Sequence, residues 1–581
     1  MTTDRHPARH TRVLLLGIIL VSIAIYLPSI NHPFIWDDEG QIVENDILRA
    51  PDALRHLLTS STFDTGGGNL AGVFYRPLVS IWNYYNFQSW QLDPAGYRLL
   101  QILPHLLAVL FVYKLVKSIL SLSKYASNET ISLFAALIYA IHPINVESVV
   151  YIGAIGEILY TLIGLIGLLM LARHLKQYPN RNIRPATLVY FCLLVLGSML
   201  AKESGVIFLL IGCVLLGLFS VVNAKQWKHY IIACITTVLT YLWLRLHVAE
   251  VPFANDYPSA ISQASLTERL LTLPYILTHY IQVLIAPIRL TIYDNTVVTS
   301  ITSPVFYIPF LTILAVTYAS VLWYRRARSK PFLFFALMFA VSLLPVMNVY
   351  GLDMTTADRW LYLPAIGFWG AVLVVLFSAT QSRQRLRYVL ISGLVIISVL
   401  YGVRSLARQQ NWSSGYALFG HDIQYVHGSF ELMDNYAAEL IKRGEYAVAI
   451  PYLEESIRLN PNWYRTRTNL GVAYQFLGDD EKAEEAYLDT IRNYPTPFAY
   501  ANLITLYYNR GDYGGAEDVI QEGLERYPNF NRLHFLRVLV LFKTDRQDEA
   551  LTIMQQLLDK QALDRDIREF ILQLDTIPPV Q

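Results

Sequence analysis

The sequence predicts an all-α protein in two parts, a polytopic helical membrane domain followed by a soluble α-solenoid. The 581 residues are 54% hydrophobic and only 16% charged, which is too apolar for one soluble domain. Apolar runs long enough to cross a bilayer recur up to residue 403. From about Ser429 the composition becomes that of a soluble protein, and one pattern recurs roughly every 34 residues.

Apolar runs of roughly 17 to 25 residues are taken as membrane spans. About eleven are expected, counting one short run: 13–30, 99–116, 131–141, 149–172, 186–200, 205–222, 230–246, 305–323, 331–349, 360–380 and 388–403. The run 266–287 contains Glu268, Arg269 and Pro274, so we expect an amphipathic or re-entrant helix that does not cross. The predicted domains are a membrane domain at 1–405, with an extracytoplasmic loop at 31–98, a linker at 406–428, and a repeat domain at 429–581.

Lys and Arg gather on alternate loops if the run 266–287 does not cross: near the N-terminus and within 114–124, 173–184, 225–228, 325–330 and 383–387. This distribution predicts a cytoplasmic N-terminus and an extracytoplasmic repeat domain, in a bacterial inner or plasma membrane or the endoplasmic reticulum membrane. The net charge of +1 gives no indication of a nucleic-acid partner. The three cysteines all lie in apolar runs, so we expect neither a disulfide framework nor a Cys-based metal site.

The repeat is marked by alanine, glycine and proline at fixed positions. Ala449, Ala483, Ala516 and Ala550 recur at the period of tetratricopeptide repeats, roughly 34 residues. Gly444, Gly478 and Gly511 are expected at the turns between paired helices, and Pro461, Pro495 and Pro528 at the ends of the units. Such solenoids bind peptides or proteins on their concave face, although a packing or dimerisation module remains an alternative.

Three consecutive carboxylates, Asp37, Asp38 and Glu39, directly follow the first apolar run. One interpretation is a solvated helix flank, and the other is a catalytic carboxylate held at the membrane face. Farther along the chain, His142 precedes Pro143 at a helix end, where a capping role is as plausible as a catalytic one. Glu147 follows, and Glu157 lies inside the next span, where a carboxylate needs a polar cavity or a partner.

Lys202 and Arg359 are predicted at the extracytoplasmic ends of apolar helices, where a phosphate would be a suitable partner. Arg76 and Arg245 are weaker candidates for the same role. The alternative is that Lys202 pairs with Glu203 and that Arg359 lies beside Asp358 at the interface. The glycine run 66–68 lacks the following Lys-Ser/Thr of a P-loop, so a flexible loop is expected there.

Five motifs together resemble a known family: Phe34–Glu39, Tyr75–Leu78, His142–Glu147, Ala201–Gly205 and Arg359–Pro364, followed by the repeats. The chain resembles the transmembrane and tetratricopeptide-repeat-containing O-mannosyltransferases and their bacterial relatives, which belong with the protein O-mannosyltransferases in the GT-C superfamily. The resemblance implies a GT-C membrane domain, a catalytic pair at Asp37 and Asp38, a polyprenyl-phosphate sugar donor and an extracytoplasmic acceptor. Many relatives carry a second His where this chain has Asn145, which weakens any metal-binding role of the segment.

The function expected is the inverting transfer of a mannose-like sugar to Ser or Thr of proteins, with membrane lipid around the enzyme and the acceptor held by the repeats. Asp37 or Asp38 is the expected base, Lys202, Arg359, Arg76 and Arg245 bind the donor phosphate, and His142, Glu147 and Glu203 support them. No metal ligand is predicted, and the cofactor is left open. The alternatives are a lipid-linked oligosaccharide or O-antigen ligase, which uses a pyrophosphate carrier, and a non-catalytic membrane-anchored repeat scaffold.

The charge distribution predicts that the loop at 31–98 and the repeat domain share the extracytoplasmic face. Topology reporters fused within 31–98 and after Gly402 should therefore both report that side. A cytoplasmic result after Gly402 would mean that 266–287 crosses the membrane.

Overall fold

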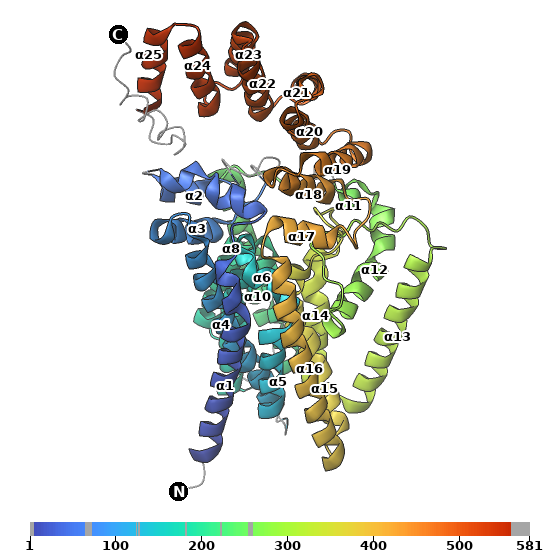
Figure 1. Ribbon diagram of the computed structural model, residues 1–581. Helices are drawn as coiled ribbons and strands as arrows, with labels where there is room; N and C mark the ends of the chain where they lie inside the picture. Colours follow the sequence, from blue (N-terminus) through green and yellow to red (C-terminus); the bar gives the residue numbers. More distant parts are fainter. Residues whose placement is uncertain are drawn as a thin grey trace. The chain divides into compact units, whose positions relative to one another are not determined.

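The computed structural model describes residues 5–50, 52–63, 73–123, 125, 128–179, 183–220, 223–253 and 259–558. The chain forms two compact units: the first consists of residues 1–48 and 52–417, and the second contains residues 418–581. Every regular element in the described ranges is a helix, so the predicted all-α class is confirmed (Figure 1). The glycine run 66–68 lies outside the described residues.

The helices of the first unit are short and long segments of one bundle. They are α1 Arg5–Tyr26, α2 Ala53–Thr59, α3 Pro77–Trp90, α4 Pro94–Leu122, α5 Asn128–Ile141, α6 Asn145–Val150, α7 Ile155–Gln177, α8 Pro185–Ala201, α9 Ile207–Phe219, α10 Ala224–Trp243, α11 Ala260–Gln263, α12 Leu266–Ile285, α13 Pro304–Ala327, α14 Lys330–Leu343, α15 Pro364–Ala379 and α16 Gln384–Asn411. The predicted loop at 31–98 thus contains α2, α3 and the start of α4.

Six described segments are long and apolar enough to cross a membrane: His10–Asn31, Pro94–Leu122, Ile152–Gln177, Ala224–Val248, Pro304–Ala327 and Gln384–Asn411. Five shorter apolar helices accompany them: Asn128–Ile141, Pro185–Ala201, Glu203–Phe219, Lys330–Val346 and Pro364–Ala379. Each of these segments coincides with one of the expected runs, while α12 belongs to neither group. The chain is therefore a multi-pass membrane protein, and the number of segments that cross remains a prediction.

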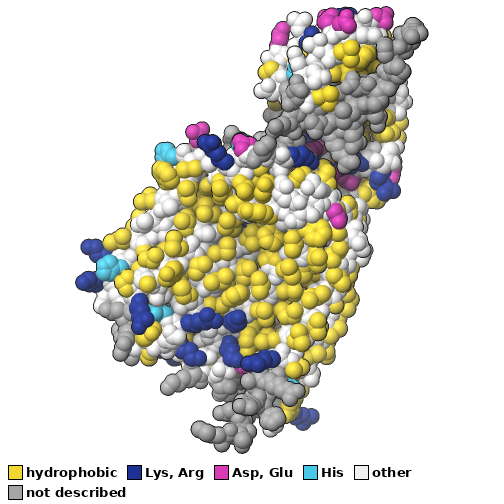
Figure 2. All heavy atoms as spheres, turned by 90° about the vertical axis from the view of Figure 1, so that its left-hand side faces the viewer, with side chains coloured by type: hydrophobic (Ala, Val, Ile, Leu, Met, Phe, Trp, Pro, Cys, Tyr) yellow, Lys and Arg dark blue, Asp and Glu magenta, His cyan; other side chains and the backbone are white. Residues whose placement is uncertain are grey.

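The surface of the first unit is that of a membrane protein. Figure 2 shows a broad face of hydrophobic side chains, with Lys and Arg gathered along its lower edge. The helix α13 has no buried residue, and exposed side chains such as Leu311 and Tyr318 cover it. An apolar surface of this extent needs a lipid environment.

Close packing between the helices fixes the positions of the segments that join them. Helices α1, α4, α5 and α16 lie side by side (Figure 1). Helices α14 and α15 approach closely at Gly367, where an added Cβ would lie 2.5 Å from the backbone nitrogen of Phe339. Glycine therefore permits this contact, and the segment that joins α14 to α15 carries Asp353 and Arg359.

The predicted linker at 406–428 contains regular structure. Helix α16 continues to Asn411, and α17 follows at Gly415–Asp422. Arg408 and Gln409, near the end of α16, are buried, and Gln409 donates a hydrogen bond to the carbonyl oxygen of Ile25 at 2.7 Å. The fall in hydrophobicity at residue 406 therefore does not mark the end of α16.

The second unit is a solenoid of paired helices: α18 Phe430–Lys442, α19 Tyr446–Leu459, α20 Tyr464–Leu477, α21 Asp480–Asn493, α22 Pro497–Arg510, α23 Tyr513–Arg526, α24 Asn531–Lys543 and α25 Gln547–Leu558. The four alanines at the repeat period are all fully buried. Gly444, Gly478 and Gly511 adopt the left-handed conformation at the turns, and Asp545 does so in the fourth unit. The predicted repeat is confirmed by this pattern.

Candidate active site

A cavity of about 450 Å³ lies in the first unit and falls in the size range of small-ligand sites. The charged residues among its lining are Asp37, Arg76, Glu157, Lys202, Glu203, Arg245, Asp353 and Arg359. The predicted carboxylate Asp37 and the four predicted phosphate-binding cations are therefore brought together. Asp38, His142 and Glu147 are not in the lining.

The neighbours of Asp37 hold its side chain at the cavity. Trp36 has a φ of 59°, an uncommon left-handed conformation for a bulky residue. Its ring stacks on Tyr151 with centroids 5.3 Å apart, and Tyr151 stacks in turn on Trp412 at 5.3 Å. The Tyr151 hydroxyl donates a hydrogen bond to Asp37 Oδ2 at 2.9 Å. Tyr151 thus positions the carboxylate that faces the open space.

Asp38, one residue later, is fully buried. Its Oδ2 accepts a hydrogen bond from the Ile35 N–H at 3.1 Å, and its Oδ1 accepts one from the Gly153 N–H at 2.7 Å. Burial raises the pKa of Asp38 to about 7, although the Arg98 guanidinium and the two N–H donors oppose the shift. Asp38 therefore fastens the loop after α1 to the turn before α7, away from the cavity.

Two residues of this arrangement, Arg98 and Tyr151, were not predicted from the sequence. The buried Arg98 guanidinium donates hydrogen bonds to the carbonyl oxygens of Pro33 at 2.6 Å and Val150 at 3.2 Å, and to that of His32. It thereby joins the same two segments as Asp38. The available signal was a lone arginine in the first turns of a long apolar helix, where a charge is costly without partners.

The ion pairs of Lys202 and Glu203 differ from the alternative given in the sequence analysis, in which these two residues pair with each other. Lys202 pairs with Glu157 and not with Glu203. Glu203 instead accepts hydrogen bonds from Arg76 at 3.0 Å and from Arg245 at 3.4 Å. Burial lowers the pKa of Lys202, and the nearby charges of Arg76 and Arg359 add to this effect, whereas Glu157 opposes it.

Arg359 is held by a buried carboxylate from another segment. Glu147 is only 1% exposed and accepts hydrogen bonds from Arg359 Nη1 at 2.5 Å and from the Arg359 backbone N–H at 3.0 Å. Asp353 lies 3.9 Å from Arg359 Nη2. Burial disfavours the charged guanidinium, but Glu147 and Asp353 hold the pKa of Arg359 above its ordinary value. Asp358, the alternative partner, lies 3.8 Å from Arg408.

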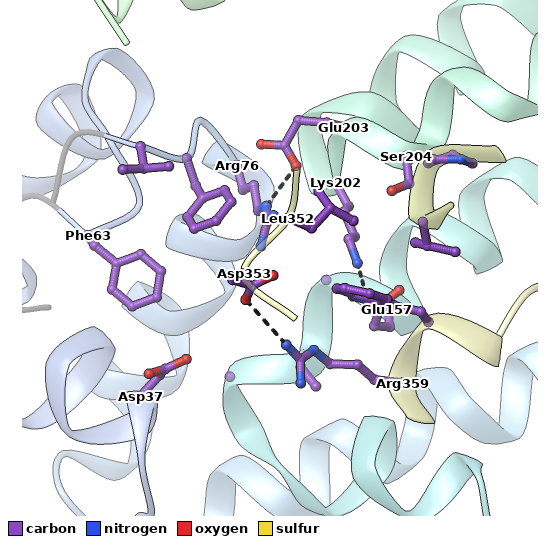
Figure 3. Close-up of a pocket in the computed structure, with 18 of the residues that line it drawn as sticks. Asp37, Phe63, Arg76, Glu157, Lys202, Glu203, Ser204, Leu352, Asp353 and Arg359 are labelled. Carbon is purple, nitrogen blue, oxygen red and sulfur yellow. Dashed lines mark hydrogen bonds and ion pairs between the residues drawn. The ribbon is translucent and has the colours of Figure 1, made fainter. Parts of the chain in front are cut away.

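The described charges are distributed unevenly around the cavity. One part contains three cations and two carboxylates: Arg76, Lys202, Arg245, Glu157 and Glu203. The other part contains Arg359 with two carboxylates, Asp37 and Asp353. Figure 3 shows Asp37 across the cavity from Lys202 and Glu157. The first part, which we call the cationic part, suits an anion, and the second presents a base.

His142 contacts the backbone through both ring nitrogens. Nε2 lies 2.9 Å from the Leu284 carbonyl oxygen, and Nδ1 lies 3.3 Å from the Ile144 nitrogen. These contacts fix Nε2 as the protonated nitrogen and match the capping interpretation. Asn145 donates a hydrogen bond to the Tyr139 carbonyl oxygen at 2.7 Å. Among the residues that the structure describes, no group of three or more His, Cys, Asp or Glu side chains is placed to hold a metal ion.

Comparison with known proteins confirms the resemblance predicted from the motifs. The tetratricopeptide repeat family model matches residues 437–496 and 502–565. A protein O-mannosyl-transferase of Caenorhabditis elegans is 24% identical over 456 residues, which cover 77% of this chain and 63% of that protein. The protein O-mannosyl-transferase TMTC3 of Homo sapiens is 22% identical over 587 residues, which cover 92% of this chain and 62% of that protein. The chain thus spans about three fifths of the length of these relatives.

Solved structures show weaker similarity. The archaeal oligosaccharyltransferase AglB from Archaeoglobus fulgidus matches 71% of this chain and 56% of its own, with 12% identity and a TM-score of 0.41. ArnT from Cupriavidus metallidurans, solved with undecaprenyl phosphate bound, matches 84% of this chain and 81% of its own, with 14% identity and a TM-score of 0.37.

The raised pKa of Asp38 predicts a pH-dependent stability. Because the folded protein binds this proton more tightly than the unfolded chain, whose Asp pKa is about 3.9, Asp38 contributes stability at low pH. This contribution is lost as the pH rises to about 7. Thermal unfolding in detergent from pH 5 to pH 8 should therefore show a steeper loss for the wild type than for Asp38→Asn. Parallel profiles would contradict the assigned burial.

Proposed function

We propose that the chain is a glycosyltransferase that moves a mannose-like sugar from a polyprenyl-phosphate donor to Ser or Thr of an extracytoplasmic protein. The observation that carries the proposal is the position of Asp37, which faces one cavity with Arg76, Lys202, Arg245 and Arg359. The similarity to proteins named protein O-mannosyl-transferases supports the choice of sugar and acceptor.

In the proposed reaction, Asp37 accepts the proton of the acceptor hydroxyl as its oxygen attacks the anomeric carbon. The bond between that carbon and the phosphate oxygen breaks, and the lipid phosphate leaves with the bonding electrons. Attack opposite to the leaving group inverts the configuration at the anomeric carbon. The cations stabilise the charge that develops on the leaving phosphate.

Asp37 is the proposed base because its environment differs from that of Asp38. The Asp38 oxygens accept hydrogen bonds from two backbone N–H groups within a buried turn, whereas the Asp37 carboxylate lines the cavity. A base must come within hydrogen-bond distance of the substrate hydroxyl. Of the two carboxylates, Asp37 is the one that lines the cavity, which supports its choice as the base.

The second unit is proposed to hold the protein acceptor, because tetratricopeptide solenoids bind extended peptides on their concave face. A scaffold without catalytic activity is the less favoured alternative. Such a protein has no need for buried charges around a cavity, since each buried ion costs several kcal/mol before it is paired. In the pairs Lys202–Glu157 and Arg359–Glu147 the carboxylates are buried, and the cations are 11% and 14% exposed.

Replacing Asp37 should abolish transfer without loss of folding. Asp37→Asn keeps the size of the side chain, and loss of a general base costs about 10²- to 10⁴-fold in rate. The measurement is transfer from synthetic polyprenyl-phosphate mannose to a Ser/Thr peptide by the purified protein. Glu39→Gln is the matched control and should be milder. Near-normal transfer by Asp37→Asn would move the base to another carboxylate, with Asp353 the first to test.

Substitutions in the Lys202–Glu157 pair distinguish a phosphate-binding role of Lys202 from a purely structural ion pair. Lys202→Met with Glu157→Gln removes both charges, so neither is left buried and unpaired. If Lys202 binds the donor phosphate, the double variant should lose about 1.5 to 3 kcal/mol of donor binding, seen as a raised KM for the donor. An unchanged donor KM would show that the pair serves only the fold.

A further inference from the structure

The last turns of α16 are fastened to three other helices. Tyr401, Ser405 and Gln409 donate hydrogen bonds to backbone carbonyl oxygens of α12, α5 and α1, at 2.8, 2.7 and 2.7 Å respectively. Their spacing of four residues places them on one face of the helix. Trp412 follows three residues later as the residue that caps α16. The position of Trp412 is therefore fixed by contacts made along the whole end of the helix.

Trp412 forms one end of a column of aromatic rings. Its side chain is buried, and its ring stacks on Tyr151 with an angle of 22° between the ring planes. Tyr151 stacks on Trp36 at 21°, and the Arg359 guanidinium lies 5.6 Å from the Trp36 ring. The column therefore connects the end of α16 with Arg359 and, through the Tyr151 hydroxyl, with Asp37.

The ring face of Trp412 makes this contact, and its N–H group does not contribute. Nε1 is buried and has no hydrogen-bond partner among the described residues, which is a cost to the fold. Arg408, one turn earlier on α16, lies 3.8 Å from Asp358, the residue that precedes Arg359. The same part of α16 thus supports the chain on both sides of the cavity.

We infer that Trp412 is a positioning residue for the proposed reaction, because it holds Tyr151 where the tyrosine hydroxyl orients the Asp37 carboxylate. This inference rests on the proposed function. Trp412 itself does not line the cavity, so its contribution is to the geometry of the base and not to the binding of the donor. A base that is misplaced relative to the acceptor hydroxyl lowers the rate of the chemical step.

Replacing the ring of Trp412 should therefore change kcat and leave KM unchanged. Trp412→Leu should lower kcat about tenfold, since a misplacement of about 1 Å can cost up to about 100-fold, with the donor KM unaltered. Trp412→Phe keeps an aromatic face and should restore most of kcat. Trp412→Met also removes the ring and serves if Trp412→Leu does not fold. A fall in kcat that Trp412→Phe does not rescue would overturn the inference.

A double-mutant cycle tests whether Trp412 acts through the Tyr151 hydroxyl. Tyr151→Phe keeps the stacked ring and removes the hydrogen bond to Asp37. In this background Trp412→Leu should cause no further loss of kcat, because both substitutions remove the same constraint on the carboxylate. Losses that multiply would contradict a route through this hydroxyl.

Fluorine NMR of the purified full chain, with a fluorinated tyrosine in place of Tyr151, reports on the same contact without any transfer reaction. The resonance should move in Trp412→Leu. Phe377→Leu is the matched control, since Phe377 is buried on α15, roughly 20 Å along that helix from its first residue at about 1.5 Å per residue. It should change neither the resonance nor kcat.

The two readouts separate the inference from the proposed function. A resonance that stays in place in Trp412→Leu, or moves equally in Phe377→Leu, would overturn the inference. A selective movement in a protein that transfers no sugar would keep the support of Tyr151 by Trp412 and reject the transferase.

Discussion

The buried ion pair between Glu147 and Arg359 is the contact on which the site depends. A carboxylate that is 1% exposed is tolerated only with a charged and hydrogen-bonded partner. Because Glu147 binds both the guanidinium and the backbone N–H of Arg359, it fixes the segment after α14 against α6. Arg359 then lies 5.6 Å from the Trp36 ring, so the same contact supports the residue that precedes Asp37.

Carboxylates hold the cations of the candidate site in place. Lys202 pairs with Glu157, Arg359 pairs with Glu147, and Glu203 pairs with both Arg76 and Arg245. Fixed charges of this kind stabilise a developing negative charge with little reorganisation, which is the main source of electrostatic catalysis. Sharing one carboxylate between two arginines also leaves the cationic part with an excess of positive charge. An anionic leaving group would complete its charge balance.

The sequence predicted the apolar segments, the repeat and several of the charged residues that line one cavity. It could not distinguish Asp37 from Asp38, because the difference arises from the left-handed φ of Trp36 and the N–H of Gly153, which is distant in sequence. It offered the wrong partner for Lys202, since Glu203 is adjacent in the chain whereas Glu157 comes from a neighbouring helix. The helical structure of the linker was not predicted, because a polar residue such as Gln409 is typical of a solvent-exposed segment. In the structure this side chain is buried and hydrogen-bonded.

We propose that the first unit transfers sugar from a lipid monophosphate. In the most direct test, the purified full chain is incubated with mannose linked α or β to polyprenyl phosphate and, separately, with a sugar linked to polyprenyl pyrophosphate. The anomeric configuration of the product is then determined by NMR. We expect that one monophosphate donor is used and that the mannose is transferred with inversion. Retention of configuration, or use of the pyrophosphate donor alone, would contradict it.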